Sequence, residues 1–204
     1  MKIEVLVCDL GQVVLPFDFS PAKRFLRTRS TPSNDPLWDP WKAMSGLHDS
    51  LGFGMGRCSS RDFFAQVSRS LGLRCNFDEF CTAFSDVFVE DPATIDLVRR
   101  ARVRLRFLLS NTNSIHWDWI TAHHGALLAI FDRLLASHEL GLQKPSEAIY
   151  KRVEGLTGLP PGAHLLIDDM PENVEGAVAI GWDGIVYTGA IDLEHKLQLR
   201  GLLP

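Results

Sequence analysis

Five short apolar runs along the chain have the length and residue types of β-strands. They cover residues 3–8, 104–109, 133–136, 164–167 and 184–187. Between and after the later of these runs lie helical patterns. Each begins at a proline, a residue favoured in the first turn of a helix. They cover residues 92–102, 145–156 and 171–180. Strands that alternate with helices predict a parallel sheet with helices packed on its faces, which is an α/β fold.

The region between the first and second strands has a different pattern. Residues 9–103 contain no convincing strand. Before the helix at 92–102, helical patterns cover residues 21–29, 37–47, 60–71 and 77–88. Because a long excursion inside a compact fold is usually functional, we predict a helical insertion at 18–90 that lies over the sheet. Residues 1–17 and 91–204 then form the α/β core.

Composition and charge narrow the class of protein. The chain has 204 residues and a formal net charge of −4, which argues against binding to nucleic acid or to a membrane surface. No segment reaches the roughly 20 apolar residues of a membrane span, and the first residues do not resemble a signal peptide. The four cysteines form no C-x-x-C pair, so no zinc site is expected. We therefore expect a cytoplasmic protein with reduced thiols.

Polar side chains follow four of the predicted strands, at the point where each strand ends or shortly after it. They are Asp9, Ser110 with Asn111, Lys144, and Asp168 with Asp169. Each alone has an ordinary alternative as a helix cap, a turn residue or a solvated lysine. The carboxyl ends of parallel strands meet at one edge of the sheet, where α/β proteins bind ligands. We therefore expect these side chains to lie together.

This set of side chains is suited to phosphoryl chemistry. Carboxylates that converge repel one another, and a hard divalent cation with oxygen ligands, such as Mg²⁺, relieves the repulsion. A hydroxyl, backbone N–H groups and a lysine can hold the oxygens of a phosphoryl group. A carboxylate such as Asp9 can attack phosphorus and form an aspartyl-phosphate.

Four segments in this order resemble the motifs of the haloacid dehalogenase-like (HAD) hydrolase superfamily. They read DLGQVV, LSNTN, LGLQKP and IDDMPENVEGA, starting at residues 9, 109, 140 and 167. They are most similar to the subgroup that includes bacterial α-D-glucose-1-phosphate phosphatase and the phosphatase domain of soluble epoxide hydrolase. The resemblance implies a Rossmann-like parallel-sheet core with a helical C1-type cap at 18–90.

The resemblance also implies a metal site. Asp9 would be the nucleophile and would also ligate Mg²⁺, with the carbonyl oxygen of Gly11 as a second ligand. Asp169 would ligate the metal directly, and Asp168 would support it through water.

A phosphate site is implied in the same way. Ser110 and the N–H of Asn111 would hold the phosphoryl oxygens, and Lys144 would neutralise charge on Asp9 and on the phosphoryl group. Asn173 would steady the loop after the fourth strand by hydrogen bonding.

Gly11 departs from the family pattern. Most phosphatases of the superfamily carry an aspartate there, which protonates the leaving group and typically contributes about 10²–10⁴-fold to the rate. Three explanations are open. The leaving group departs without help, or another acid serves, such as Asp18 at the entry to the insertion or His116 in a surface loop after the second strand, or the protein binds phosphate compounds with little turnover.

The favoured hypothesis is a Mg²⁺-dependent phosphatase that acts on a small phosphorylated metabolite, expected to be a sugar phosphate. The alternatives are a metal-independent 2-haloacid dehalogenase and a non-catalytic binding module with the same fold. The insertion is expected to select the substrate, with hinges near Phe17 and Asp91. Its first candidates for substrate contact are Trp38, Trp41, Met44, His48 and Phe53.

Overall fold

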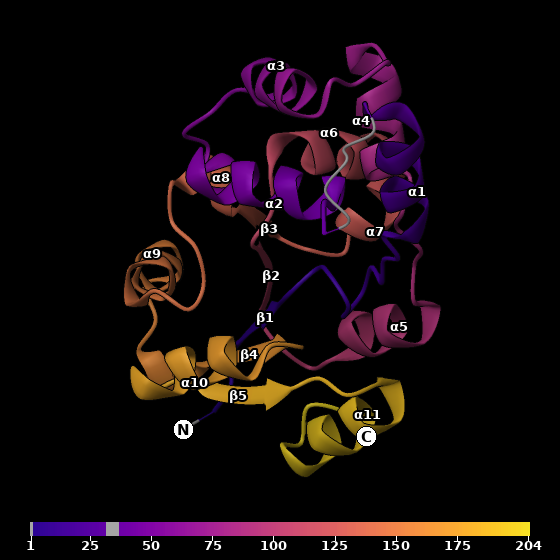
Figure 1. Cartoon of the computed structure of the whole chain (residues 1–204). Coiled ribbons are helices and arrows are strands. Elements are labelled where there is room, and N and C mark those ends of the chain that lie inside the picture. The colour runs from indigo at the N-terminus through magenta and orange to yellow at the C-terminus, as the bar shows by residue number, and fades with distance from the viewer. Residues whose placement is uncertain (1, 32–36) are drawn as a thin grey trace.

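The computed structural model describes residues 2–31 and 37–204, so residue 1 of the predicted core and residues 32–36 of the predicted insertion lie outside the described part. One parallel sheet has the strand order β3-β2-β1-β4-β5 (Figure 1). Its strands are β1 (Val5–Cys8), β2 (Leu105–Ser110), β3 (Arg133–Ala136), β4 (His164–Asp168) and β5 (Asp183–Val186). The predicted parallel α/β fold is confirmed, with small shifts at the strand ends.

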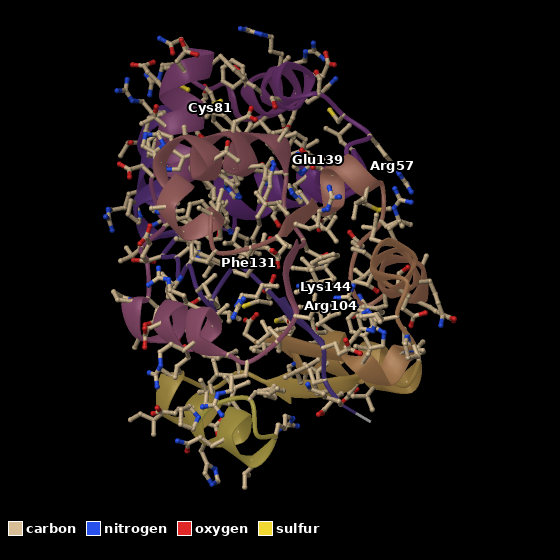
Figure 2. The ribbon with its side chains drawn as sticks, turned by 180° about the vertical axis from the view of Figure 1, so that it is seen from behind. Arg57, Cys81, Arg104, Phe131, Glu139 and Lys144 are labelled. Carbon is tan, nitrogen blue, oxygen red and sulfur yellow. The ribbon has the colours of Figure 1, made fainter. Side chains whose placement is uncertain are left out.

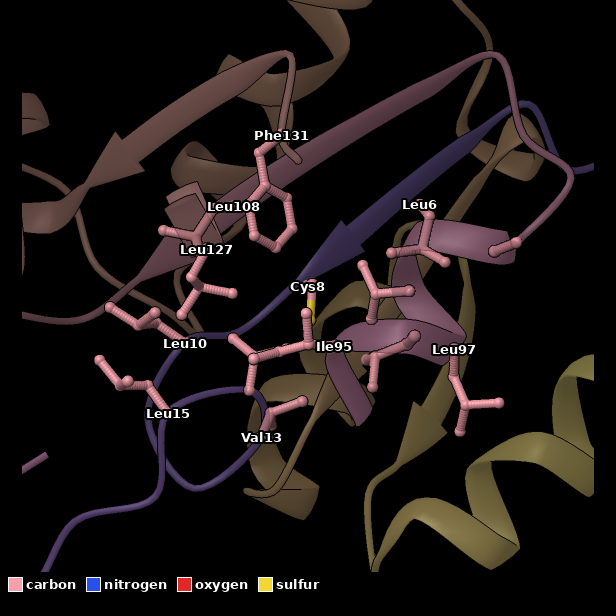
Figure 3. Close-up of a cluster of buried hydrophobic side chains, with 14 of the residues drawn as sticks. Leu6, Cys8, Leu10, Val13, Leu15, Ile95, Leu97, Leu108, Leu127 and Phe131 are labelled. Atoms are coloured by element: carbon pink, nitrogen blue, oxygen red, sulfur yellow. The ribbon is translucent and has the colours of Figure 1, made fainter. Parts of the chain in front are cut away.

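Helices cover both faces of the sheet (Figure 1). They are α5 (Pro92–Arg100) and α11 (Ala190–Leu199) on one face, and α9 (Glu147–Thr157) and α10 (Pro171–Ala179) on the other. Successive strand residues point to opposite faces, so Leu6 and Cys8 enter one apolar cluster while Val5 and Val7 enter the other. Figure 3 shows the first cluster, where Leu6 and Cys8 lie near Ile95 of α5. Among the described residues, no helix is long and apolar enough to cross a membrane.

Between β1 and α5 the described residues form a group of helices around a third apolar cluster. They are α1 (Ser20–Arg29), α2 (Pro40–Ser50), the short 3₁₀ helix η1 (Phe53–Met55), α3 (Ser60–Leu71) and α4 (Phe77–Ser85), called the cap helices below. Aromatic rings fill the centre of the cluster. Phe53 stacks on Phe63 with 4.2 Å between ring centroids, and Phe80 stacks on Phe84 at 5.6 Å.

Three of the predicted helix boundaries in this region are wrong, and one of them is the end of α2, which lies at Ser50 instead of residue 47. Helix α2 begins at Pro40 instead of residue 37, because Asp39 caps it by accepting the Trp41 N–H at 2.9 Å. Helix α4 ends at Ser85 instead of residue 88, because Phe88 forms an antiparallel bridge with Phe17. The other two helices start and end at or next to the predicted residues.

Helices that were not predicted follow β2, β3 and β5 and include α6 (Ser114–His123), α7 (Gly125–Leu128) and α8 (Ser137–Leu140). Helix α6 has no single apolar stripe, because it is buried on two sides. Its Ile115 enters the cap cluster, while Trp117 and Ile120 enter the core cluster beside the sheet. A helix between two cores lacks the 3.6-residue amphipathic period on which the sequence analysis relied.

The cap helices join the sheet through two chain segments that run side by side. The Val89 N–H donates to the Pro16 carbonyl oxygen at 2.8 Å, and the Asp18 N–H donates to the Val87 carbonyl oxygen at 3.1 Å. These bonds lie close to the positions where hinges are predicted.

A second junction joins η1 to α8. The Ser137 hydroxyl lies 2.6 Å from the Gly54 carbonyl oxygen and 2.9 Å from that of Thr112, and it accepts the Thr112 N–H at 2.9 Å. Gly56 follows η1 with a φ of 68°, and a Cβ atom there would overlap the His138 carbonyl oxygen. Only glycine allows this close approach of backbone to backbone.

Gly56→Ala is therefore expected to lower the free energy of unfolding by about 2 kcal/mol or more. A left-handed conformation costs a non-glycine residue roughly 1–2 kcal/mol, and the overlap with His138 adds to that cost. Chemical denaturation measures the effect. Gly141→Ala is the matched control, since Gly141 has a φ of 65° but no heavy atom within 4 Å of the added Cβ. Equal losses in the two variants would show that the η1–α8 contact does not require glycine.

Candidate active site

The chain places three polar groups where the central strands end. Asp9 directly follows β1, and its N–H donates to the Ile167 carbonyl oxygen of β4 at 2.8 Å. Ser110 is the last residue of β2, and Asp168 is the last residue of β4. Because β2 and β4 flank β1, the parallel topology brings these side chains to one edge of the sheet, as predicted.

Lys144 lies at the centre of this group. Its ammonium Nζ lies 2.8 Å from Asp9 Oδ1 and 2.6 Å from Asp168 Oδ2, and its side chain, labelled in Figure 2, is 1% exposed. Burial lowers the pKa of Lys144, but the two carboxylates raise it more, so the net pKa lies above its ordinary value. Lys144 is therefore a fixed cation between the two strand ends.

Asn111 fixes the backbone that carries this lysine. The Lys144 N–H donates to Asn111 Oδ1 at 2.9 Å, and Asn111 Nδ2 donates to the Lys144 carbonyl oxygen at 2.8 Å. From the sequence, Asn111 is expected to act only through its N–H group. A side-chain amide can pair with a peptide group in both directions, but its partner becomes visible only in the folded chain.

Asp168 and Asp169 have different surroundings. Asp168 is fully buried, and its oxygens accept hydrogen bonds from Lys144 Nζ, from Asn173 Nδ2 at 2.8 Å and from the Met170 N–H at 3.0 Å. Asp169 is only partly buried and lines the cavity described below. The bond from Asn173 steadies the loop after β4 as expected, and Asp169 is the freer of the two carboxylates.

The carboxylates fit a divalent cation. One oxygen each from Asp9, Asp168 and Asp169 lies within 4.8 Å of the others. Three carboxylates and the one Lys144 ammonium leave a formal charge of −2. Burial, followed by repulsion from Asp168, raises the pKa of Asp169, and burial also raises the pKa of Asp9 against the opposing effect of Lys144. An all-oxygen donor set with this net negative charge suits Mg²⁺.

These residues form the floor of a cavity with a volume of about 400 Å³. Gly11, Ser110 and Asn111 line it together with Asp9, Lys144 and Asp169, so the predicted site residues other than Asp168 share one cavity. Its other walls come mainly from the cap helices and the segments beside them. They include Phe17, Phe19, Trp41, Met44, His48, Phe84 and Phe88.

Two of the predicted substrate-contacting residues do not line the cavity. Trp38 packs at the side of the cap cluster, and Phe53 is fully buried inside it. Trp41, Met44 and His48 do line the cavity. Ser137 also lines it and was missed, although it directly follows β3, where the strand-end rule applies as well.

Neither alternative acid named in the sequence analysis is suited to that role. Asp18 is exposed and is absent from the cavity wall, and it accepts the Ser20 N–H at 2.8 Å at the start of α1. His116 lies in the wall but is buried in helix α6, so its assignment to a surface loop was wrong.

Both ring nitrogens of His116 have partners. Nδ1 lies 3.2 Å from Asn113 Nδ2, and Nε2 lies 3.2 Å from the Phe84 carbonyl oxygen. Burial lowers the pKa of His116 to about 3, so the ring is neutral at physiological pH and has no proton to spare. His116 is a structural part of the aromatic wall.

Gly11 is held against an aromatic ring. A Cβ atom at this position would lie 3.0 Å from Cε1 of Phe17, which is closer than ordinary van der Waals contact. Phe17 therefore packs over the place where an aspartate side chain would begin. The packing around Gly11 therefore leaves little room for the side chain of the usual acid.

Comparison with known proteins agrees with this geometry. No protein-family model matches the chain. A curated protein of Bacteroides thetaiotaomicron, D-ribitol-5-phosphate phosphatase, is 23% identical over 204 residues, which cover 97% of this chain and 98% of that protein.

Solved structures are similar over nearly the whole chain. A HAD family enzyme of B. thetaiotaomicron matches with a TM-score of 0.83 at 22% identity, covering 96% of this chain and 98% of that one. Another structure of that enzyme, in complex with magnesium and inorganic phosphate, matches with a TM-score of 0.79. The L-2-haloacid dehalogenase of Xanthobacter autotrophicus matches with a TM-score of 0.62 at 20% identity, covering 100% of this chain and 85% of that one. The chain therefore has the α/β fold of the HAD hydrolases.

Proposed function

We propose that this protein is a Mg²⁺-dependent phosphatase that hydrolyses a small phosphorylated metabolite through an aspartyl-phosphate. One observation carries the proposal: Lys144 holds Asp9 at the floor of a cavity, beside two further carboxylates at the end of β4. The curated relative named as a phosphatase and the similar HAD enzyme that binds magnesium and phosphate support it.

Asp9 is the nucleophile in this proposal. Its carboxylate attacks phosphorus, the bond from phosphorus to the ester oxygen breaks, and an aspartyl-phosphate forms. Water then attacks this phosphorus and releases inorganic phosphate and the Asp9 carboxylate. Lys144 lies 2.8 Å from Asp9 and stabilises the negative charge that gathers at both steps.

The positions of the residues at the strand ends suggest which of them would bind the metal and which the phosphate. Asp9, Asp169 and the Gly11 carbonyl would hold Mg²⁺, with Asp168 in support, and the bound ion would supply charge neutralisation at the phosphoryl oxygens. Ser110 and the Asn111 N–H would hold the remaining phosphoryl oxygens.

The cavity suits the monophosphate of a small neutral molecule such as a sugar. Aromatic rings of Phe19 and Trp41, with 4.9 Å between centroids, offer faces to the C–H groups of a sugar or polyol. Among the described residues that line the cavity, Lys144 is the one lysine or arginine. Lys144 is already paired with two carboxylates, so a second phosphate group would find no free cation there.

The cap helices cover this site and would select the substrate. We propose that residues 18–90 act as a C1-type cap that opens at the paired segments around Phe17 and Asp91. The motif segments further suggest the subgroup of α-D-glucose-1-phosphate phosphatase. A panel that contains glucose 1-phosphate and ribitol 5-phosphate separates an anomeric from a primary-alcohol leaving group.

Phosphate release from p-nitrophenyl phosphate and from this panel is expected to stop in EDTA and to return with Mg²⁺. Asp169→Asn is expected to raise the Mg²⁺ concentration for half-maximal activity by about 10-fold or more, because it removes a charged ligand. Asp192→Asn, in α11, is the control and leaves the Mg²⁺ requirement unchanged.

Two other outcomes would point elsewhere. Activity that is indifferent to EDTA would contradict the proposal and favour the 2-haloacid dehalogenase, whose chemistry needs no metal. A folded protein that binds Mg²⁺ and turns over no substrate would favour a binding module. The cluster of three carboxylates argues against the dehalogenase, since that reaction has no use for a cation site.

A further inference from the structure

His48 is a second histidine in the cavity wall, and it differs from His116 in its contacts. It lies in the last turns of α2, and its side chain is 29% exposed. Nδ1 lies 3.1 Å from Asp49 Oδ1, so the carboxylate favours the proton on Nδ1. Within the described part of the chain, Nε2 has no hydrogen-bond partner.

Aromatic packing fixes the plane of the His48 ring. The ring meets Phe53 edge to face with 5.7 Å between centroids and an angle of 83°, and it meets Phe63 at 6.1 Å and 87°. Both phenylalanines are fully buried. The ring orientation is therefore set by rigid neighbours on one side and by Asp49 on the other.

His48 lies close to the segment that carries the phosphate-binding groups. A Cβ atom at Gly54 would lie 3.1 Å from Cε1 of His48, 3.6 Å from its Nε2 and 3.8 Å from the Thr112 carbonyl oxygen. Thr112 follows Ser110 and Asn111 at the end of β2. The free nitrogen of His48 is thus near the place where the cap helices touch the phosphate-binding loop.

The other titratable groups of the cavity are already in use. Asp9, Lys144 and Asp169 belong to the nucleophile and metal site, and both nitrogens of His116 are hydrogen bonded. Among the described lining residues, His48 is the remaining titratable side chain, and its Nε2 has no hydrogen-bond partner there. A histidine oriented by a carboxylate, with its second nitrogen free, is a common general acid and base.

We propose that His48 is a catalytic residue that protonates the leaving group, in place of the acid missing at Gly11. This inference rests on the proposed phosphatase function. Asp9 attacks phosphorus, the bond from phosphorus to the ester oxygen breaks, and the Nε2 proton of the His48 imidazolium passes to that oxygen, so a neutral alcohol leaves. Neutral His48 then takes a proton from the water that attacks the aspartyl-phosphate, and phosphate and the Asp9 carboxylate are released.

Two charged or titratable groups act on His48. Asp49 faces Nδ1 with its Oδ1 at 3.1 Å, and His116 is the titratable neighbour, whose pKa burial lowers to about 3. The elements packed against the ring present Phe53, Phe63 and Gly54, which carry no charge.

The test compares leaving groups. We would measure kcat/KM of the full-length, Mg²⁺-loaded protein on p-nitrophenyl phosphate, phenyl phosphate and a primary-alcohol sugar phosphate. A poor leaving group needs a proton, while p-nitrophenolate departs without one. His48→Gln is therefore expected to lower kcat/KM about 10²-fold or more on the sugar phosphate, less on phenyl phosphate and least on p-nitrophenyl phosphate.

Two further variants separate chemistry from folding. Asp49 has an 80% exposed side chain, so Asp49→Asn keeps the packing and is expected to give the same trend with a smaller amplitude. If His48→Gln fails to fold, the Asp49→Asn variant tests the role of His48 in its place. His195→Gln, at an exposed histidine of α11, is the control and is expected to change none of the three values.

The inference and the proposed function fail in different ways. If the wild type releases phosphate and His48→Gln lowers kcat/KM equally on all three substrates, or on none of them, only the role of His48 is overturned. A wild-type protein that releases phosphate from none of them would overturn the proposed function itself.

Discussion

Asp9→Asn is expected to lower kcat by at least about 10⁴-fold while the protein stays folded. The carboxylate oxygen that would attack phosphorus is lost, and loss of a covalent nucleophile commonly costs this much or more. The asparagine amide has nearly the same shape and can still fill the space beside Lys144. Phosphate release under saturating substrate and Mg²⁺ measures the change.

The same variant is expected to be as stable as the wild type or more stable in Mg²⁺-free buffer. It removes one of three clustered carboxylates, and Lys144 keeps its partner Asp168 at 2.6 Å. Relief of such functional strain commonly adds up to about 2 kcal/mol to the free energy of unfolding. A variant that loses activity only because it unfolds would leave the role of Asp9 unsupported.

Lys144→Met is expected to have the largest effect on stability, a loss of about 3–5 kcal/mol in Mg²⁺-free buffer. The substitution leaves Asp9, Asp168 and Asp169 together without their cation, and two of these carboxylates are buried. Mg²⁺ is expected to restore part of the loss, since it binds the same carboxylates in the folded state. Urea denaturation with and without Mg²⁺ measures both effects.

Lys151→Met is the matched control for this prediction. Lys151 forms an ion pair with Glu154 at 2.9 Å, but its side chain is 46% exposed on α9. Exposed pairs of this kind contribute about 0–1 kcal/mol. Similar losses in the two variants would contradict the view that Lys144 neutralises a buried cluster.

The site could be predicted to a large extent because it follows from topology. In a parallel sheet the carboxyl ends of neighbouring strands must meet, so Asp9, Ser110 and Asp168 were expected to lie together once the strands were recognised. Lys144 was placed by the same rule and by the resemblance of its segment to a known motif. The strands themselves were recognisable as short apolar runs, and β1 and β4 are buried along their whole length on both faces.

Contacts that depend on the rotation of a helix about its own axis could not be predicted from the sequence. An apolar stripe shows that a helix is buried, but it does not show which residues meet a cavity and which meet other helices. Phe53 and Trp41 therefore looked equivalent in the sequence, although only Trp41 reaches the cavity. His116 was misplaced for a related reason, because α6 lies between two apolar clusters and lacks a simple period.

Gly11 illustrates the same limit. The sequence shows that the usual acid is missing, but not that the Phe17 ring covers its place or that His48 has a free nitrogen in the same cavity. These contacts depend on how side chains pack in the folded chain, and the sequence does not show that packing. In the proposed mechanism, a residue of the cap helices supplies the proton that the core motifs do not provide.

The most direct test of the central claim is to trap the phosphorylated protein. We would quench the Mg²⁺-loaded enzyme in acid during turnover of p-nitrophenyl phosphate, reduce it with borohydride and map the peptides by mass spectrometry. Borohydride converts an aspartyl-phosphate to homoserine, so the account predicts homoserine at position 9 in the wild type and none in Asp9→Asn. Turnover that leaves Asp9 unmodified, or that marks another residue, would contradict it.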